Sequence, residues 1–177
     1  MNFVEVEILK VINSFVSNEF FDFIFKLISR LGDKGAIWIL LSVALCIFPR
    51  TRKAGICSAI SLLLCLFVGN MILKPLFDRM RPYEFDTTLR IIIPPLKDGS
   101  FPSGHTMAAF AFASSVGIHF KRLRTYLYTA AVLMGLSRIY LCVHYPTDVI
   151  FGAIFGICYG VIACKIYNLL PKAGITK

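Results

Sequence analysis

The chain has 177 residues, of which 57% are hydrophobic and 16% charged, and its formal net charge is +9. Its apolar runs are too long for an ordinary soluble core, so the composition favours a polytopic membrane protein over a soluble one. The positive charges gather at the ends of the apolar runs instead of alternating with aromatic residues. This pattern disfavours nucleic acid as a partner and favours the anionic surface of a lipid bilayer.

The first part of the chain predicts an amphipathic segment and one doubtful apolar helix. In residues 3–17 the apolar side chains recur with helical spacing, which predicts a helix that lies on or near a membrane face. Residues 19–31 are rich in aromatic side chains but carry three charges on one helical face. This pattern fits a short protein-facing span or an interfacial helix. A turn at residues 32–35 then leads into a short apolar span at residues 36–48.

Four further apolar spans follow, at residues 54–73, 104–120, 125–143 and 147–169. The first of them is about twenty residues long, and a helix of about 30 Å crosses the hydrocarbon of a bilayer. Glycines in the last span, such as Gly156 and Gly160, predict close contact with another helix. The pattern predicts an all-α, polytopic membrane helical bundle in a single domain, residues 1–177. It has six transmembrane helices if residues 19–31 also span.

Two basic links between spans predict the orientation in the membrane. One link covers residues 50–53 and the other residues 121–124, and each holds three Lys or Arg residues. Short basic loops stay on the cytoplasmic side, so both links are expected inside the cell. The long polar loop at residues 74–101 is then expected on the extracytoplasmic face of the cell membrane.

Two cations frame the start of that long loop. Lys74 ends the clearest span, and Arg81 follows in a segment that Pro75 and Pro82 stiffen. A lysine at a helix end commonly extends only to the membrane surface. Two cations held in fixed positions, by contrast, bind a phosphate dianion well. Lys74 and Arg81 are therefore predicted phosphate-binding residues.

A Pro-Ser-Gly-His sequence at residues 102–105 marks the point where the loop enters the next helix. Ser103 is predicted as the N-cap, and Gly104 lets the backbone approach a ligand closely. The free N–H groups of the first helical turn offer an anion site. An ordinary capped helix start explains Ser103 and Gly104 but does not need His105, which is well placed to donate a proton to a leaving oxygen.

A third polar group precedes the last span. Arg138 lies inside an apolar run, where a charge is costly and is usually functional or paired. His144 and Asp148 lie four residues apart. This spacing allows the carboxylate to hold one imidazole nitrogen and leaves the other free to attack. A His-Asp pair alone is commonly a local hydrogen bond, but the nearby arginine and second histidine favour a catalytic pair.

The remaining histidine and the cysteines are predicted to be structural. All six cysteines lie in apolar stretches without the paired spacing of a metal site, so they are expected to pack as small hydrophobic residues. His119 is expected at the cytoplasmic membrane surface beside Lys121.

The three polar groups together form a signature. As Lys-x6-Arg-Pro, Pro-Ser-Gly-His and Ser-Arg-x5-His-x3-Asp, they resemble the complete signature of the phosphatidic acid phosphatase type 2 superfamily, in the same order. The resemblance covers residues 74–148, and the flanking helices are similar to those of compact bacterial membrane members with six spans. It implies an enzyme that hydrolyses a lipid phosphate or lipid diphosphate.

The resemblance also implies a role for each residue. His144 would be the nucleophile that forms a phosphohistidine, Asp148 would orient it, and His105 would act as general acid and then as the base for water. The implied phosphate-binding residues are Lys74, Arg81, Ser103, Gly104 and Arg138. Three fixed cations take the place of magnesium in other phosphoryl-transfer sites, so neither a metal nor another cofactor is expected.

The family resemblance leaves several substrates open. Undecaprenyl diphosphate, cleaved to undecaprenyl phosphate and phosphate, is the leading one, and phosphatidylglycerophosphate or phosphatidate is the alternative. A non-catalytic protein or transporter that binds lipid phosphates is a distant third, because binding alone needs the cations but not the two histidines and the aspartate. The further cations of the long loop, Arg79, Arg90 and Lys97, either meet a second phosphate or pair with acids of the same loop.

Overall fold

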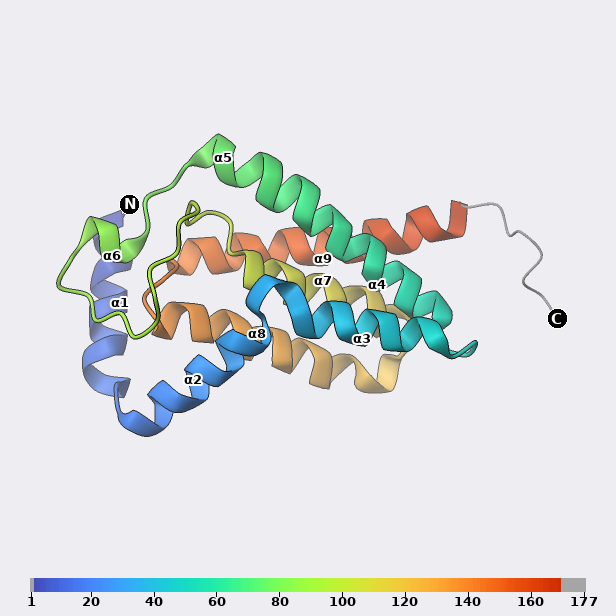
Figure 1. The fold of residues 1–177 in the computed structure, drawn as a ribbon, viewed down its shortest axis with the longest axis horizontal. Helices are drawn as coiled ribbons and strands as arrows, with labels where there is room; N and C mark the ends of the chain where they lie inside the picture. Colours follow the sequence, from blue (N-terminus) through green and yellow to red (C-terminus); the bar gives the residue numbers. More distant parts are fainter. Residues whose placement is uncertain (1, 170–177) are drawn as a thin grey trace.

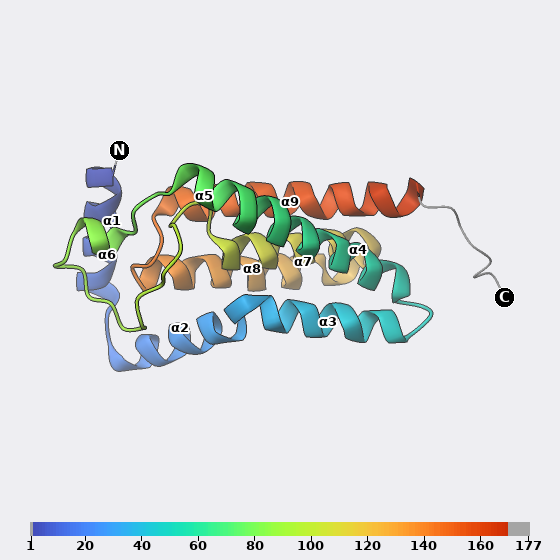
Figure 2. The same ribbon diagram turned by 45° about the horizontal axis from the view of Figure 1, so that its top comes forward.

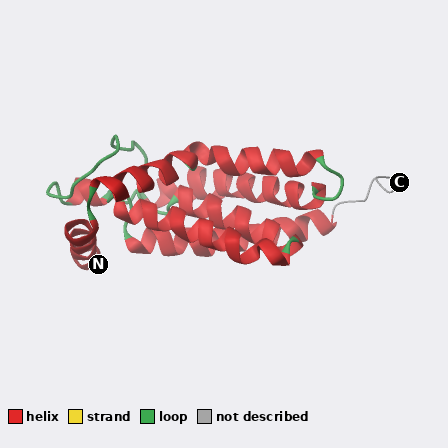
Figure 3. Ribbon diagram, turned by 90° about the horizontal axis from the view of Figure 1, so that it is seen from below, coloured by secondary structure: helices red, strands yellow, loops and turns green. Residues whose placement is uncertain are grey.

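The computed structural model describes residues 2–169, which form helices and loops without a strand (Figure 3). Residues 1 and 170–177 of the predicted domain lie outside the described residues. The all-α prediction is confirmed for the described part. The helices are α1 (Asn2–Val16), α2 (Glu19–Leu31), α3 (Ala36–Ile47), α4 (Arg52–Leu64), α5 (Lys74–Phe77), α6 (Pro82–Phe85), α7 (Gly104–His119), α8 (Arg124–Tyr140) and α9 (Pro146–Leu169).

Helix α7 forms the centre of the bundle, where it packs against α3, α4, α8 and α9. Its residues from Thr106 to Gly117 are all buried. The contact with α9 is close because a Cβ atom at Gly156 would lie only 2.4 Å from the carbonyl oxygen of Met107. The predicted close packing of the last span is therefore confirmed, and any larger residue at Gly156 would separate the two helices.

Helices α2 and α3 follow one another along the same side of the bundle, with a bend between them (Figures 1 and 2). The bend falls at Gly32 and a short 3₁₀ turn, Asp33–Gly35. Helix α2 packs against α8, whereas α3 packs against its antiparallel neighbour α4. Residues 19–31 are thus the first half of one bent path. The predicted count of six spans, which required residues 19–31 to cross on their own, stays a prediction.

Two helical stretches among the described residues are long and apolar enough to cross a bilayer by themselves, Arg52–Phe85 and Pro146–Leu169. The first contains α4, a π-helical stretch at Cys65–Leu73, and α5. A π-helical stretch changes the direction in which the following side chains point and is frequent at functional sites. It leads here directly into Lys74.

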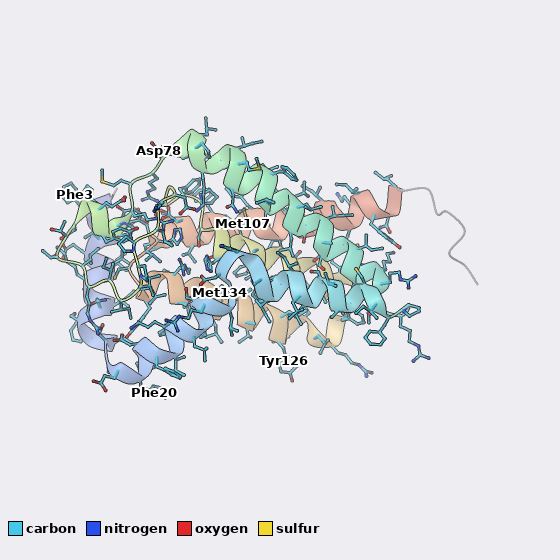
Figure 4. The ribbon with its side chains drawn as sticks, in the orientation of Figure 1. Phe3, Phe20, Asp78, Met107, Tyr126 and Met134 are labelled. Atoms are coloured by element: carbon cyan, nitrogen blue, oxygen red, sulfur yellow. The ribbon has the colours of Figure 1, made fainter. Side chains whose placement is uncertain are left out.

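Helix α1 lies across one end of the bundle instead of along it (Figures 1 and 2). Its outer side exposes Phe3 and Phe15, while Val6 and Leu9 are buried against the protein. Figure 4 shows Phe3 at this end of the molecule and Met107 among the helices of the interior. An apolar surface on a helix in this position fits the predicted interfacial segment.

The polar loop between α5 and α7 lies at the same end as α1, and the two basic links lie at the other end (Figure 1). Ion pairs fasten this loop to the first two helices. Lys10 Nζ lies 2.8 Å from Asp86 Oδ2, and an Arg90 guanidinium nitrogen lies 2.6 Å from Asp22 Oδ2. The loop is therefore held against α1 and α2, which encloses the end of the bundle where the signature residues lie.

Candidate active site

The structure brings the eight predicted site residues together at the end of the bundle that α1 covers. Lys74 begins α5, Arg81 precedes α6, and Ser103, Gly104 and His105 start α7. Arg138 lies near the end of α8, His144 lies just before α9, and Asp148 lies in the first turn of α9. Six of these side chains are buried, namely Lys74, Arg81, Ser103, Arg138, His144 and Asp148.

Arg81 is held in place by protein carbonyls and by one carboxylate. Its Nε donates to the backbone oxygen of Asp98 at 2.9 Å, and one NH1 hydrogen bond goes to the backbone oxygen of Val143 at 2.6 Å. NH2 donates to Asp98 Oδ1 at 2.8 Å, and Lys74 Nζ donates to the other oxygen of the same carboxylate. Asp98 therefore bridges the two predicted phosphate-binding cations.

The ionisation of Asp98 follows from these two partners. Although partial burial alone would raise its pKa, the hydrogen bond from Lys74 and the charges of Lys74 and Arg81 lower that pKa to about 2. The carboxylate is thus charged at neutral pH and neutralises part of the positive site. No spacing in the sequence distinguishes Asp98 from the other acids of the loop.

Arg138 keeps unused donors at the centre of the site. It is 1% exposed, and its NH1 group donates to the hydroxyl of Ser29 on α2. Its Nε and NH2 have no hydrogen-bond partner among the described residues. Buried donors are almost always paired in proteins, and a guanidinium costs even more to leave unpaired. These two nitrogens therefore indicate a position for an anion.

His144 lies between the cations and Asp148. Its Nε2 is 3.5 Å from NH1 of Arg81, and its Nδ1 is 3.6 Å from Asp148 Oδ2. Burial, together with the positive charges of Arg81, Arg138 and Lys74, lowers the pKa of His144 well below its ordinary value. The imidazole is therefore neutral at neutral pH, with a lone pair available on one nitrogen.

The predicted hydrogen bond between His144 and Asp148 is not formed, because Nδ1 of His144 has no hydrogen-bond partner among the described residues. The Asp148 carboxylate instead accepts from Ser100 Oγ at 2.5 Å and from the backbone N–H of Tyr145 at 2.9 Å. The second of these bonds closes the turn that starts α9. Asp148 is thus adjacent to the imidazole but bound to the loop and the helix start.

Arg79 is the cationic partner of Asp148, at 2.5 Å between NH1 and Oδ1. Its NH2 group also lies 2.6 Å from Glu5 Oε2 on α1. The sequence offered Arg79 and Arg90 either a second phosphate or acids of their own loop. The carboxylate partners that the structure gives these two residues lie instead on α1, α2 and α9, outside their own loop, and contact with a second phosphate stays a prediction. No local spacing could have indicated pairs so distant in the sequence.

His105 also has a carboxylate partner that the sequence did not indicate. Its Nε2 lies 3.0 Å from Asp33 Oδ1, in the bend between α2 and α3. The bend reaches the start of α7 closely, since a Cβ atom at Gly32 would lie 2.8 Å from the ring of His105. The sequence pattern predicts only a turn at residues 32–35 and no site residue there. Each histidine of the site therefore lies beside one acid.

Ser103 occupies the N-cap position of α7, as predicted, but its side chain makes no capping hydrogen bond. Its hydroxyl pairs with that of Thr106 at 2.9 Å, and its backbone N–H donates to the backbone oxygen of Asp148 at 3.1 Å. Ser103 thereby ties α7 to α9. Next to it, Asn70 Oδ1 lies 3.1 Å from where a Cβ atom at Gly104 would stand, so a side chain there would crowd the helix start.

Three potential metal ligands lie together elsewhere in the bundle. Cys57 of α4, His119 of α7 and Cys164 of α9 have donor atoms within 4.8 Å of one another, and no other such group of three occurs among residues 2–169. The sequence pattern predicts no relation between these three residues. Two thiols and an imidazole suit a soft ion such as zinc. The carboxylates beside the two histidines of the signature, in contrast, are bound to cations or to hydrogen-bond donors.

Fold and site are those of a helical-bundle protein with a cluster of buried cationic side chains and two imidazoles. The chain belongs to the PAP2 superfamily, whose family model matches residues 54–171. The match contains the whole signature, whereas Glu5, Ser29 and Asp33 lie before its first residue.

Similar proteins are named as phosphatases of lipid phosphates. The chain is 32% identical over 136 residues to an undecaprenyl-diphosphatase of Sulfolobus acidocaldarius, with 76% of this chain and 66% of that protein aligned. It is 31% identical over 100 residues to a lipid A 1-phosphatase of Rhizobium etli, with 54% of this chain and 43% of that protein aligned. The chain thus spans two thirds or less of the length of these relatives.

A solved structure is similar over almost the whole chain. The crystal structure of Aquifex aeolicus LpxE matches with a TM-score of 0.79 at 31% identity, and the match covers 90% of this chain and 93% of that one. A match of this coverage extends beyond residues 54–171, which the family model matches.

Proposed function

We propose that the protein hydrolyses a membrane lipid phosphate or diphosphate through a phosphohistidine intermediate, without a metal ion. The observation that carries the proposal is the pair of buried Arg138 nitrogens, which have no hydrogen-bond partner within residues 2–169, together with the nearby neutral His144. Together with Lys74 and Arg81, these donors can hold the three outer oxygens of a phosphoryl group and stabilise their charge in the transition state.

The first step transfers the phosphoryl group to the enzyme. Nε2 of His144 attacks phosphorus, an N–P bond forms, and the P–O bond to the departing lipid oxygen breaks. Asp148, on the Nδ1 side of the ring at 3.6 Å, stabilises the positive charge that the imidazole gains. His105, oriented by Asp33, gives a proton to the departing oxygen.

The second step returns the enzyme to its starting state. His105, now without that proton, takes one from a water molecule, and the water oxygen attacks phosphorus. The N–P bond breaks, inorganic phosphate leaves, and His144 is again neutral. Ser103 and Gly104 contribute the start of α7, whose N–H groups face an anion favourably.

Undecaprenyl diphosphate is the proposed substrate, and a phosphomonoester lipid such as phosphatidylglycerophosphate or phosphatidate is the alternative. The similarity to an undecaprenyl-diphosphatase supports the first, and the similarity to a lipid A 1-phosphatase keeps a phosphomonoester open. Of the three extra cations in the long loop, Arg79 and Arg90 are committed to ion pairs. The exposed Lys97 is the one we assign to the second phosphate.

The proposed location is the cell membrane, with several crossings and with the site on the extracytoplasmic face. The two basic links at residues 50–53 and 121–124 support this orientation through the positive-inside tendency. Cysteine labelling of intact cells tests it on a background without the native cysteines. A cysteine at position 97 should react before the membrane is permeabilised, and reaction only afterwards would reverse the orientation.

Phosphate release by the purified full chain tests the substrate assignment. The panel contains undecaprenyl and farnesyl diphosphate, phosphatidylglycerophosphate, phosphatidate and lipid A 1-phosphate in one detergent. We expect kcat/KM for the isoprenyl diphosphates to exceed that for phosphatidate by about tenfold, which is about 1.4 kcal/mol of transition-state binding. A preference for any monophosphate over both diphosphates would overturn the substrate. The variant His144→Ala is the control for contaminating phosphatase.

A further inference from the structure

One acid of α1 is buried although the helix itself is amphipathic and largely exposed. The side chain of Glu5 is 7% exposed, whereas that of Glu7, two residues later on the same helix, is 68% exposed. A buried carboxylate costs free energy unless cations and hydrogen-bond donors surround it. The contacts of Glu5 therefore identify the groups that stabilise this buried carboxylate.

Both oxygens of the Glu5 carboxylate are engaged, one with the first turn of α9 and the other with Arg79. Oε1 accepts from the backbone N–H of Thr147 at 3.0 Å and from its hydroxyl at 2.7 Å. Oε2 accepts from NH2 of Arg79 at 2.6 Å. The first two bonds fix the first turn of α9 directly, and the third fixes the cation that binds Asp148.

Arg79 lies between two carboxylates, one from α1 and one from α9. Its NH1 group donates to Asp148 Oδ1 and to the Thr147 hydroxyl, and its guanidinium stacks on the ring of Tyr145 at 4.0 Å from the ring centre. These three residues around the start of α9 all lie within four positions of His144. The position of the guanidinium thus determines where the Asp148 carboxylate can stand.

Small movements of Asp148 matter because its distance to His144 is just too long for a hydrogen bond. The separation of 3.6 Å between Oδ2 and Nδ1 must shorten to about 3 Å for the carboxylate to stabilise the imidazole as its charge develops. Misplacement of a catalytic group by about 1 Å can cost about a hundredfold in rate. Because Glu5 holds the other side of the Arg79 guanidinium, Asp148 is better confined than it would be beside an arginine that faced solvent.

We propose that Glu5 is a positioning residue for the phosphoryl transfer and acts through Arg79 and Thr147 on Asp148 and His144. The inference deepens the proposed function and rests on it. Glu5 precedes the family match, which begins at residue 54, so the signature does not contain it. Helix α1 in this view is part of the active site and not only a contact with the membrane surface.

The test compares Glu5→Gln with the matched control Glu7→Gln in the full chain. Glutamine at position 5 keeps the shape and can still accept from Thr147, but it loses the charge that faces Arg79. We expect kcat to fall about tenfold or more with KM within about twofold of wild type, because ground-state binding of the lipid is not altered. The Glu7→Gln variant should match wild type in both constants, because that side chain is exposed and pairs only with Lys10 among the described residues.

A double variant shows whether Glu5 acts through Arg79. If it does, Glu5→Gln combined with Arg79→Gln should have the kcat of Arg79→Gln alone within about twofold, whereas independent effects would multiply. Thermal unfolding of each variant in the same detergent separates positioning from loss of the fold. The expected result is a reduced kcat in a Glu5→Gln chain whose Tm stays close to wild type.

Three results would overturn the inference. They are equal kcat values for Glu5→Gln and Glu7→Gln, a raised KM with an unchanged kcat, or multiplicative losses in the double variant. A wild-type chain that releases phosphate from no lipid of the panel would instead overturn the proposed function, and this inference with it. The two failures are thus distinguished by the activity of the wild type.

Discussion

Replacement of Asp98 by asparagine tests whether an internal carboxylate occupies the position of a substrate phosphate oxygen. Asp98 bridges Lys74 and Arg81, the two cations that the signature assigns to phosphate. Its pKa is lowered to about 2, first through Lys74 and then through Arg81, against the opposing effect of burial. An arriving phosphate dianion must therefore displace a charged group that already uses both cations.

The structure gives the size of the expected effect. The Asp98 side chain is 56% exposed, so each of its two ion pairs is screened by solvent and contributes at most about 1 kcal/mol. Asparagine keeps the shape, and the backbone oxygen of residue 98 still accepts from Arg81 Nε. Removal of the competing charge should then favour anion binding by about 1 kcal/mol in total, which is about fivefold in a binding constant.

Inhibition by vanadate provides the assay, because vanadate mimics the transferred phosphoryl group and binds the same cations. The inhibition constant of Asp98→Asn should be about fivefold lower than that of wild type. Asp86→Asn is the matched control, because Asp86 also has a pKa lowered to about 2, through a hydrogen bond from Lys10 outside the site. An unchanged or higher inhibition constant for Asp98→Asn would show that the carboxylate supports the cations instead of competing for them.

Three further outcomes are expected. His144→Ala should abolish the phosphoenzyme that is trapped by acid quenching. His105→Ala should slow turnover by about 10²–10⁴-fold, and less for a diphosphate, whose leaving group needs less help from an acid. Equal losses on diphosphates and monophosphates would exclude His105 as the general acid. Because burial and neighbouring cations lower the pKa of His144, the nucleophile becomes protonated only well below pH 6.5, so the acid limb of kcat/KM should lie below that pH. In Arg81→Gln this limb should move to higher pH, and a limb that stays in place would contradict the assigned cause. Activity should survive EDTA and should not change in Cys57→Ser, which removes one donor of the possible metal site; an absolute need for magnesium would exclude the proposed chemistry.

The residues of the signature could be predicted from the sequence because each lies at a helix end, where a local pattern is readable. Arg138 in an apolar run and His105 at a helix start are examples. The hydrogen bond of Asp148 could not be predicted correctly, because the i, i+4 spacing to His144 competes with the turn at Tyr145 N–H and with Ser100. The outcome depends on where the long loop packs, which no spacing encodes.

The supporting acids and the path of the first helices were beyond the reach of the sequence pattern. Glu5 resembles any acid of an amphipathic helix, and Asp33 resembles any acid of a turn. Their partners, Arg79 and His105, lie 74 and 72 positions away. Only the docking of α1 and of the bend after α2 against the bundle brings these pairs together. The same bend makes residues 19–31 continue into α3.

The position of these supports in the chain has a consequence for how activity can vary within the superfamily. The family match begins at residue 54, yet the carboxylates that face Arg79 and His105 belong to residues 5 and 33. We therefore expect two proteins with the same signature to differ in turnover where their N-terminal segments lack these acids. A chimaera that joins this chain's residues 54–171 to a relative's N-terminal helices should catalyse the reaction of this chain with a kcat that depends on the relative's N-terminal helices.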